Sequence, residues 1–259
     1  MAKKIYSYND NDSPPKIVIL SGSGISVDSG MSLYRGDTGL WNNYNIKDVC
    51  HYEYWKVKGR DKTIYDDFYN SLRSKIEKGE PNHIHLKIAE WEKRYGANRV
   101  INMTQNIDNF LEKAGCTNVH HMHGEITKNR CLHCNNSWEI GYDIQDYTKF
   151  VCPKCGTKNK VKTDVLFFNE PFNLYYHNFK KAMNSLNSHD ILLIIGTSNA
   201  VLRTSLMHYV DYNQGFKVLN NLEFSEHLPE RSFDSIFYEP SKTAIDKIDE
   251  TIVKVRMKD

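Results

Sequence analysis

Runs of consecutive apolar residues mark the interior of this chain. Residues 17–20 read Ile-Val-Ile-Leu and residues 191–195 read Ile-Leu-Leu-Ile-Ile. Apolar runs of this length are typical of strands buried on both faces, as in a parallel sheet. Shorter strands are predicted at 100–103 and 218–220. The pattern therefore predicts an α/β protein built on a parallel sheet.

Between these strands, apolar residues at helical spacing predict packing helices. One helix is expected to end at Gly79, and the residues that recur every four positions along it are Ile64, Phe68, Leu72 and Ile76. A second begins near Pro81 and ends before Gly96, and others cover 174–187 and 241–256. We expect the charged residues of the first two helices on solvated faces.

Composition excludes several classes of protein. The 259 residues are 40% hydrophobic and 25% charged, typical of a globular protein with a sizeable core. The net charge is only +2, so we expect neither a nucleic-acid nor a membrane partner. No apolar run is long enough to cross a bilayer, and the N-terminal residues lack the apolar segment of a secretory signal. We expect a cytoplasmic protein.

Two CxxC pairs, seventeen residues apart, predict a metal site. Four thiolates complete a tetrahedral Zn²⁺ site with no open position, which is a structural arrangement. The ligands would be Cys131, Cys134, Cys152 and Cys155. A redox-active CxxC and unrelated thiols are the alternatives. Cys50 and Cys116 are expected to be free thiols.

Small and polar residues follow the predicted strands where ligands bind in α/β proteins. Residues 21–24 read Ser-Gly-Ser-Gly, which is typical of a phosphate-binding turn before a helix or of a plain glycine turn. Residues 104–108 read Thr-Gln-Asn-Ile-Asp, which also fits a turn with a helix cap. Thr197 follows another strand and suits a cofactor phosphate or ribose.

Five segments in this order resemble the signatures of the sirtuins, the NAD-dependent protein deacylases. They lie at 22–41, 104–124, 165–170, 196–201 and 221–240. The sirtuin pattern places a catalytic histidine directly before a glycine, which selects His123 over His120 and His121. A neutral imidazole there can accept a proton from a ribose hydroxyl. The sequence departs from the family's usual residues at Ser23, Tyr34, Asn169 and Pro240, among other positions.

The resemblance implies a Rossmann-like sheet, a smaller zinc-ribbon and helical domain, and NAD between them. The large domain would comprise 1–41, 91–125 and 163–259, and the small domain a helical module, 42–90, and a zinc module, 126–162. The implied catalytic residues are His123, Asn106 and Asp108. The implied cofactor-binding residues are Gly22, Ser23, Gly24, Ser26, Tyr34, Arg35, Trp41, Gln105, Asn106, Ile107, Asp108, Gly196, Thr197, Ser198, Asn221, Leu222, Glu223 and Pro240.

An acyl-lysine protein or peptide is the implied substrate, received by main-chain pairing around Val165, Phe168 and Asn169. By resemblance, the acyl oxygen attacks the nicotinamide ribose, nicotinamide leaves, and deacylation yields O-acyl-ADP-ribose. Sirtuins that remove succinyl or malonyl groups carry a Tyr and an Arg three apart. Here Tyr69 and Arg73 are four apart, so a carboxylate-binding role and a plain surface arginine are both open.

Two other functions are compatible with the sequence. The departures from the family pattern favour an NAD glycohydrolase or an ADP-ribosyltransferase, whereas His123 favours the deacylase. A non-enzymatic zinc-ribbon binding module would not need the sheet-edge motifs.

Overall fold

The computed structural model describes residues 15–33, 39–57, 61–171, 175–212 and 215–256. Tyr34 and Arg35, which we expected near the cofactor, lie outside these ranges, as does the side chain of Trp41.

Six parallel strands form the larger sheet, in the order β3-β2-β1-β7-β8-β9. Their bounds are β1 Ile17–Ser21, β2 Val100–Thr104, β3 Val119–His121, β7 Ile191–Ile195, β8 Phe216–Asn221 and β9 Ser235–Tyr238. This is the strand order of dinucleotide-binding α/β folds, in which the chain reverses direction across the sheet between two central strands. Here those strands are β1 and β7, so a ligand crevice is expected at their carboxyl ends. The prediction of a Rossmann-like parallel sheet is confirmed.

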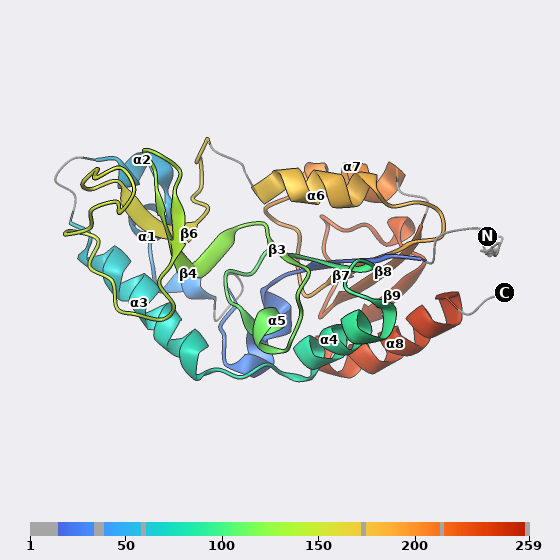
Figure 1. The fold of residues 1–259 in the computed structure, drawn as a ribbon. Helices are drawn as coiled ribbons and strands as arrows, with labels where there is room; N and C mark the ends of the chain where they lie inside the picture. Colours follow the sequence, from blue (N-terminus) through green and yellow to red (C-terminus); the bar gives the residue numbers. More distant parts are fainter. Residues whose placement is uncertain (1–14, 34–38, 58–60, 172–174, 213–214, 257–259) are drawn as a thin grey trace.

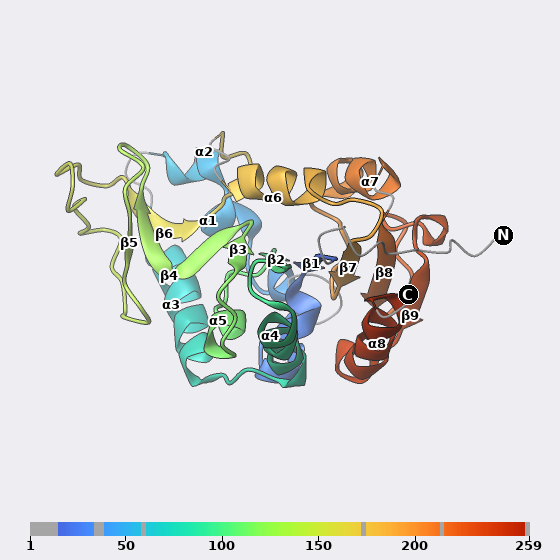
Figure 2. The same ribbon diagram turned by 45° about the vertical axis from the view of Figure 1, so that its right-hand side comes forward.

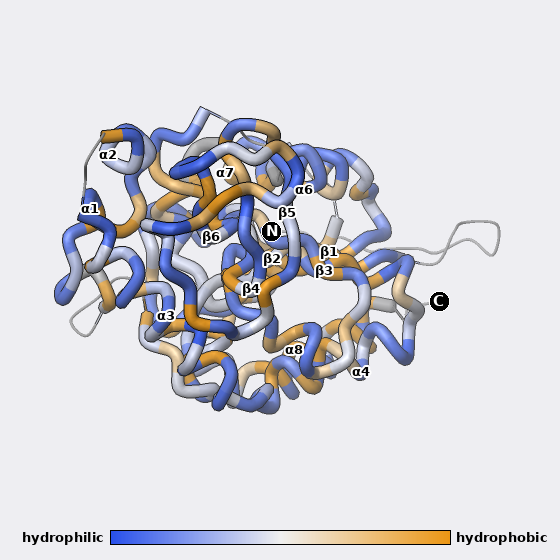
Figure 3. The backbone as a smooth tube through the Cα atoms, turned by 60° about the vertical axis from the view of Figure 1, so that its left-hand side comes forward, coloured by the Kyte–Doolittle hydropathy of each residue, from blue (hydrophilic) through white to orange (hydrophobic). Residues whose placement is uncertain are grey.

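Helices cover both faces of this sheet (Figure 1). On one face lie α4 (His83–Tyr95) and α8 (Ser241–Arg256), and on the other lie α6 (Tyr175–Asn184) and α7 (Arg203–Tyr212). Figure 3 shows the hydrophobic stretch of β1 inside, with hydrophilic stretches toward the outside. The predicted apolar strands are buried because helices pack on both sides of them.

The smaller domain extends from one end of the sheet (Figure 2). It contains a three-stranded antiparallel sheet in the order β5-β4-β6 and three helices. Their bounds are α1 Ile46–Cys50, α2 Tyr52–Trp55, α3 Thr63–Lys78, β4 Gly124–Cys131, β5 Ser137–Glu139 and β6 Val161–Val165. Short elements outside these layers are α5 (Phe110–Lys113) and 3-10 segments at Ser23–Ser29, Leu40–Asn42 and Glu230–Ser232.

The predicted boundary between domains does not follow the packing at two places. Ile84 and Ile88 of α4, which we expected in the helical module, belong to the core around β1 and β2. Conversely, β6 pairs with β4 of the small sheet, although we expected 163–165 in the large domain. We propose that the small domain comprises about 40–79 and 124–170.

The face of α3 also differs from the prediction. Ile64 is 51% exposed, whereas Tyr65, Tyr69 and Arg73 are buried. The Tyr65 ring packs edge-on against Tyr147, at 5.2 Å between centroids, because α3 lies beside the loop that precedes β6. The expectation that the charged residues of this helix are solvated is wrong for Arg73.

Within the described ranges, no helix is long and apolar enough to cross a membrane. This agrees with the absence of a long apolar run in the sequence. A cytoplasmic location stays a prediction.

Candidate active site

The carboxyl ends of β1 and β7 meet through glycines. The amide of Gly24 donates to the carbonyl of Gly196 at 2.9 Å, and the amide of Gly22 donates to Ile195 at 3.0 Å. A Cβ added to Gly24 would lie 2.7 Å from the Cα of Gly196. Gly196 itself has φ +65°, a conformation that favours glycine. The glycines are therefore needed where two main chains touch.

This contact bears on the two interpretations of the turn, a phosphate-binding turn and a plain glycine turn. The amides of Gly22 and Gly24 both donate to β7 and the turn after it, as in a plain glycine turn. The expected helix is a seven-residue 3-10 segment, Ser23–Ser29, in place of an α-helix.

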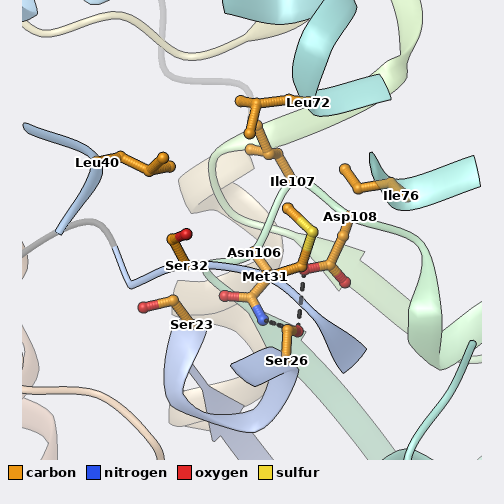
Figure 4. Close-up of a pocket in the computed structure, with 10 residues that line it drawn as sticks. All are labelled: Ser23, Ser26, Met31, Ser32, Leu40, Leu72, Ile76, Asn106, Ile107 and Asp108. Carbon is orange, nitrogen blue, oxygen red and sulfur yellow. Dashed lines mark hydrogen bonds between the residues drawn. The ribbon is translucent and has the colours of Figure 1, made fainter. Parts of the chain in front are cut away.

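A small pocket lies beside this junction, between the two domains. One side is polar, and Figure 4 shows Ser26, Asn106 and Asp108 together there. The opposite side is apolar and comes from α3 and neighbouring loops. Its residues are Met31, Leu40, Leu72, Ile76 and Ile107. Ser23 and Ser32 complete the lining.

Hydrogen bonds hold the polar side of the pocket rigid. The Ser26 hydroxyl donates to Asp108 Oδ2 at 3.0 Å and accepts from Asn106 Nδ2 at 3.0 Å. Asn106 Nδ2 also donates to the Gly22 carbonyl at 3.2 Å. Burial raises the pKa of the Asp108 carboxyl to about 6, against hydrogen bonds that favour the carboxylate. Asp108 is thus a carboxyl group that titrates close to neutral pH.

His123 is held with one ring nitrogen ready to accept a proton. Its Nδ1 lies 2.8 Å from the Gln105 carbonyl, which can only accept, so Nδ1 carries the hydrogen and Nε2 the lone pair. Nε2 is buried, and no described residue hydrogen-bonds to it. Burial also lowers the pKa of His123, which keeps the imidazole neutral. Gln105 Nε2 is a second buried nitrogen without a partner among the described residues.

The neighbouring histidines are placed differently. Both ring nitrogens of His121 are bonded, Nδ1 to the Asn106 carbonyl and Nε2 to Glu112, each at 2.8 Å. His120 lies with Nδ1 3.4 Å from Asn178. Among these three histidines, only His123, which the resemblance selected, has a buried Nε2 without a partner among the described residues.

At the far end of the crevice, the predicted residues fall into a buried and an exposed group. Thr197 donates its amide to Asn221 Oδ1 at 3.1 Å and lies near Gln105, so both residues support the turn after β7. Leu222, Glu223 and Pro240 are exposed. Ser198 accepts a hydrogen bond through its carbonyl from Ser225, which ties two loops together.

The predicted substrate segment is a turn docked on the helical module. The strand ends at Val165, and Phe168 pairs with the chain between α1 and α2: its amide donates to Cys50 and its carbonyl accepts from Tyr52, both at 3.0 Å. Main-chain pairing of a substrate with Phe168 therefore needs groups that are already occupied. Asn169 has φ +61°, which explains why a position usual for Gly accepts Asn.

Four buried charged residues hold this turn. Glu170 accepts from the Phe167 amide at 2.9 Å and from Arg130 at 2.5 Å. Arg130 also donates to Asp164 at 2.7 Å, and Lys162 lies 3.4 Å from Glu170. Buried charges of this kind are stable only when paired, so the turn has one well-defined position.

Tyr69 and Arg73 point away from the pocket. The Arg73 guanidinium donates to Asn70 at 2.5 Å and to Thr163 at 3.3 Å, inside the small domain. Leu72, which precedes Arg73 on the same helix, lines the pocket instead. Arg73 is therefore neither a surface arginine nor an arginine that faces the pocket to bind a carboxylate.

The four predicted cysteines come together at the tip of the small domain. All four sulfurs lie within 4.8 Å of one another. Two of the separations, Cys131–Cys155 and Cys134–Cys152, are 3.8 and 3.7 Å. A tetrahedron with Zn–S bonds of about 2.3 Å has edges of about 3.8 Å, so the sulfurs fit a Zn²⁺ ion and are too far apart for disulfides. Cys50 and Cys116 are buried free thiols, as expected.

Several pocket residues were not singled out by the sequence. Met31, Ser32 and Leu40 were inside the first signature, whereas Leu72 and Ile76 had been assigned only to packing. The helical spacing of Leu72 and Ile76 predicts a buried face of the helix, but it does not show whether that face packs against the core or lines a ligand pocket.

Comparison with known proteins agrees with the geometry. A model of the Sir2 family matches residues 22–203. The chain is 34% identical to an NAD-dependent protein deacylase of Helicobacter hepaticus, over 92% of this chain and 97% of that protein. It is 37% identical to an NAD-dependent protein deacylase of Campylobacter jejuni, over 90% and 93% of the two chains.

Solved structures show the same fold. A Sir2 homologue in complex with ADP-ribose superposes with a TM-score of 0.77 at 26% identity, covering 92% of each chain. A complex of a Sir2 homologue with NAD superposes with a TM-score of 0.74 at 26% identity, covering 93% of this chain and 90% of that one. From its strand order, its four-cysteine cluster and these matches, the chain belongs to the Sir2 family.

Proposed function

We propose that this chain is an NAD-dependent protein deacylase in which His123 is the general base. The observation that carries the proposal is the buried, unpartnered Nε2 of His123 at the carboxyl edge of a dinucleotide-binding sheet. A buried acceptor without a partner costs folding free energy, on the order of 1–3 kcal/mol, unless a ligand completes it. The relatives named as deacylases and the Sir2 complexes with NAD and ADP-ribose support the same assignment.

The described residues fit NAD at several points. Gln105 Nε2 is a buried donor without a partner, and His123 Nε2 is a buried acceptor, so hydroxyl groups of a ribose could satisfy both. The pocket combines an apolar wall with the amide of Asn106 and the carboxyl of Asp108, which suits a flat aromatic amide such as nicotinamide. When bound, NAD supplies an electrophilic ribose carbon and nicotinamide as the leaving group.

The protein's own residues then handle position and protons. Asn106 and Asp108 orient the nicotinamide end, because Ser26 fixes both side chains. His123 takes the proton of a ribose hydroxyl at Nε2, and the Gln105 carbonyl stabilises the imidazolium that results through Nδ1–H. The pocket lies between the domains, so closure around the ligands would exclude water from the reacting groups.

The substrate is proposed to be an acyl-lysine peptide with a neutral acyl group. The candidate partner for a carboxylated acyl chain, Arg73, is buried and donates to Asn70 and Thr163 inside the small domain. Because the main chain of Phe168 is already paired, we propose that Phe168 and Asn169 meet the peptide through their side chains.

Mass spectrometry of the products tests the proposal. Incubation with NAD and an acetyl-lysine peptide should give deacetylated peptide, nicotinamide and O-acetyl-ADP-ribose in equal amounts. His123→Ala should reduce the rate by about 10²–10⁴-fold, the usual contribution of a general base, with a nearly unchanged thermal melt. Free ADP-ribose formed at the same rate without peptide would contradict the deacylase and favour an NAD glycohydrolase.

A further inference from the structure

The loop that carries Asn106 and Asp108, residues 105–108, is held by two histidines at consecutive carbonyl groups. His123 Nδ1 bonds the Gln105 carbonyl, and His121 Nδ1 bonds the Asn106 carbonyl, each at 2.8 Å. The first bond belongs to the proposed base. The second has no part in the chemistry described above.

His121 is a buried imidazolium by its hydrogen-bond geometry. The Asn106 carbonyl can only accept, so Nδ1 carries a hydrogen. On the other side, Glu112 Oε1 lies 2.8 Å from Nε2, and a carboxylate likewise accepts. A ring that donates from both nitrogens is positively charged. The His121 side chain is only 3% exposed, so Glu112 supplies the charge that makes this form stable.

We propose that the Glu112–His121 ion pair positions the loop 105–108, so that dinucleotide binding weakens as His121 loses its proton. This rests on the proposed function, because the loop matters only if it holds NAD. His121 and Glu112 are positioning residues, since neither lines the pocket.

The sign of the pH dependence follows from the surroundings of His121. Burial opposes its charge, but the bond and charge of Glu112 outweigh burial, and the pKa of His121 is raised above 6.5. Besides Glu112, the ionisable groups around the pair are Asp108, Glu125, His120, His85 and Cys116. The acids among them favour the imidazolium.

Deprotonation leaves His121 with a single N–H for two acceptors. One of the two 2.8 Å contacts then becomes a lone pair facing an oxygen, which is repulsive. The Glu112–His121 ion pair therefore stabilises the loop 105–108 fully below pH 6.5, and this contribution is lost as the pH rises through the raised pKa of His121. Because the Gln105 and Asn106 carbonyls are adjacent, a shift at one also disturbs the bond that fixes the tautomer of His123.

Two measurements on the whole protein test the inference. In NMR titrations of the ligand-free protein, both ring nitrogens of His121 should be protonated at pH 6.5, and Glu112→Gln should lower the pKa of His121. In calorimetry with ADP-ribose, Glu112→Gln should weaken binding about tenfold at pH 7, the usual effect of losing one charged hydrogen bond.

The pH profile separates positioning from a general loss of structure. Wild-type affinity for ADP-ribose should fall at alkaline pH, and His121→Gln, which cannot titrate, should bind more weakly but without that fall. His120→Gln is the matched control and should keep the wild-type profile, because His120 bonds neither Asn106 nor Glu112 in this way. A wild-type profile that His121→Gln shares, or a Glu112→Gln affinity within twofold of wild type, would overturn the inference. If wild-type protein binds no ADP-ribose at any pH, the proposed function fails, and the NMR titration still tests the ion pair.

Discussion

Substitution of Gly24 by alanine should damage the active site by forcing two turns apart. The added Cβ would lie 2.7 Å from the Gly196 Cα and 2.8 Å from the Gly196 oxygen, both main-chain atoms. Normal contact requires a further separation of about 0.7–1 Å, and close-packed interiors do not absorb such a shift freely. Gly196 cannot easily move away, because its amide donates to the Asn220 carbonyl of β8 at 3.0 Å.

The magnitude of the effect can be worked from this geometry. Overpacking costs about 1–3 kcal/mol of stability, and the stretched hydrogen bonds of Gly22 and Gly24 to β7 cost roughly 1 kcal/mol each. A displacement of about 1 Å in a positioned site costs roughly 100-fold in rate. We therefore expect Gly24→Ala to lose about 2–4 kcal/mol of stability and roughly 100-fold in kcat/KM for NAD.

Chemical denaturation and steady-state kinetics with varied NAD measure the two effects. Gly30→Ala is the matched control at the other end of the same segment: it has φ +87° with nothing within 4 Å of the added Cβ. It should cost roughly 1–2 kcal/mol through backbone strain while leaving the junction in place. If Gly24→Ala keeps kcat/KM for NAD within threefold of wild type, the junction does not position the site.

Three other substitutions or substrates test separate parts of the structure. Asp108→Asn should stabilise the fold by roughly 3 kcal/mol above pH 6 and by little near pH 3.8. The native carboxyl has a pKa raised to about 6, so its unfavourable ionisation develops as the pH rises from 3.8 to about 6; urea denaturation across this range measures it. If Asp108→Asn stabilises the fold equally at pH 3.8 and above pH 6, burial of the carboxylate is not the cause. Cys131→Ser should lose zinc, measured by atomic absorption, and destabilise the small domain, because a structural zinc contributes folding free energy; Cys116→Ser, outside the cluster, should keep both. An acetyl-lysine peptide should react at least tenfold faster than its succinyl counterpart, since the Arg73 guanidinium is already bonded to Asn70 and Thr163 inside the small domain; equal rates would refute this account of Arg73.

Local pattern was sufficient for the central strands, the last helix and the cysteine cluster. The strands at 17–20 and 191–195 were predicted because burial on both faces requires an uninterrupted apolar run. The helix 241–256 was predicted with the bounds that the structure shows. The CxxC spacing predicted the sulfur cluster, because each pair binds one metal through a short turn and needs no other information.

Contacts between distant residues could not be predicted in this way. Gly24 meets Gly196, and Arg73 meets Thr163, only after the chain has folded. The sequence therefore could not show that Gly24 lies in a contact between two main chains, or that the charged side chain of Arg73 is buried. The Glu112–His121 pair is closer in sequence, but nothing in the pattern indicates that a strand brings them together. Resemblance supplied the roles of residues, and the structure supplies the contacts that support those roles.

The position of Arg130 links the four-cysteine cluster to the turn that we propose receives the substrate. Arg130 directly precedes Cys131, and its guanidinium reaches Glu170, which in turn fixes the turn at Phe167. A protein that gives up its zinc would release the end of β4 first, and with it the anchor of that turn. Chelation should therefore raise the KM for peptide before it affects affinity for the dinucleotide.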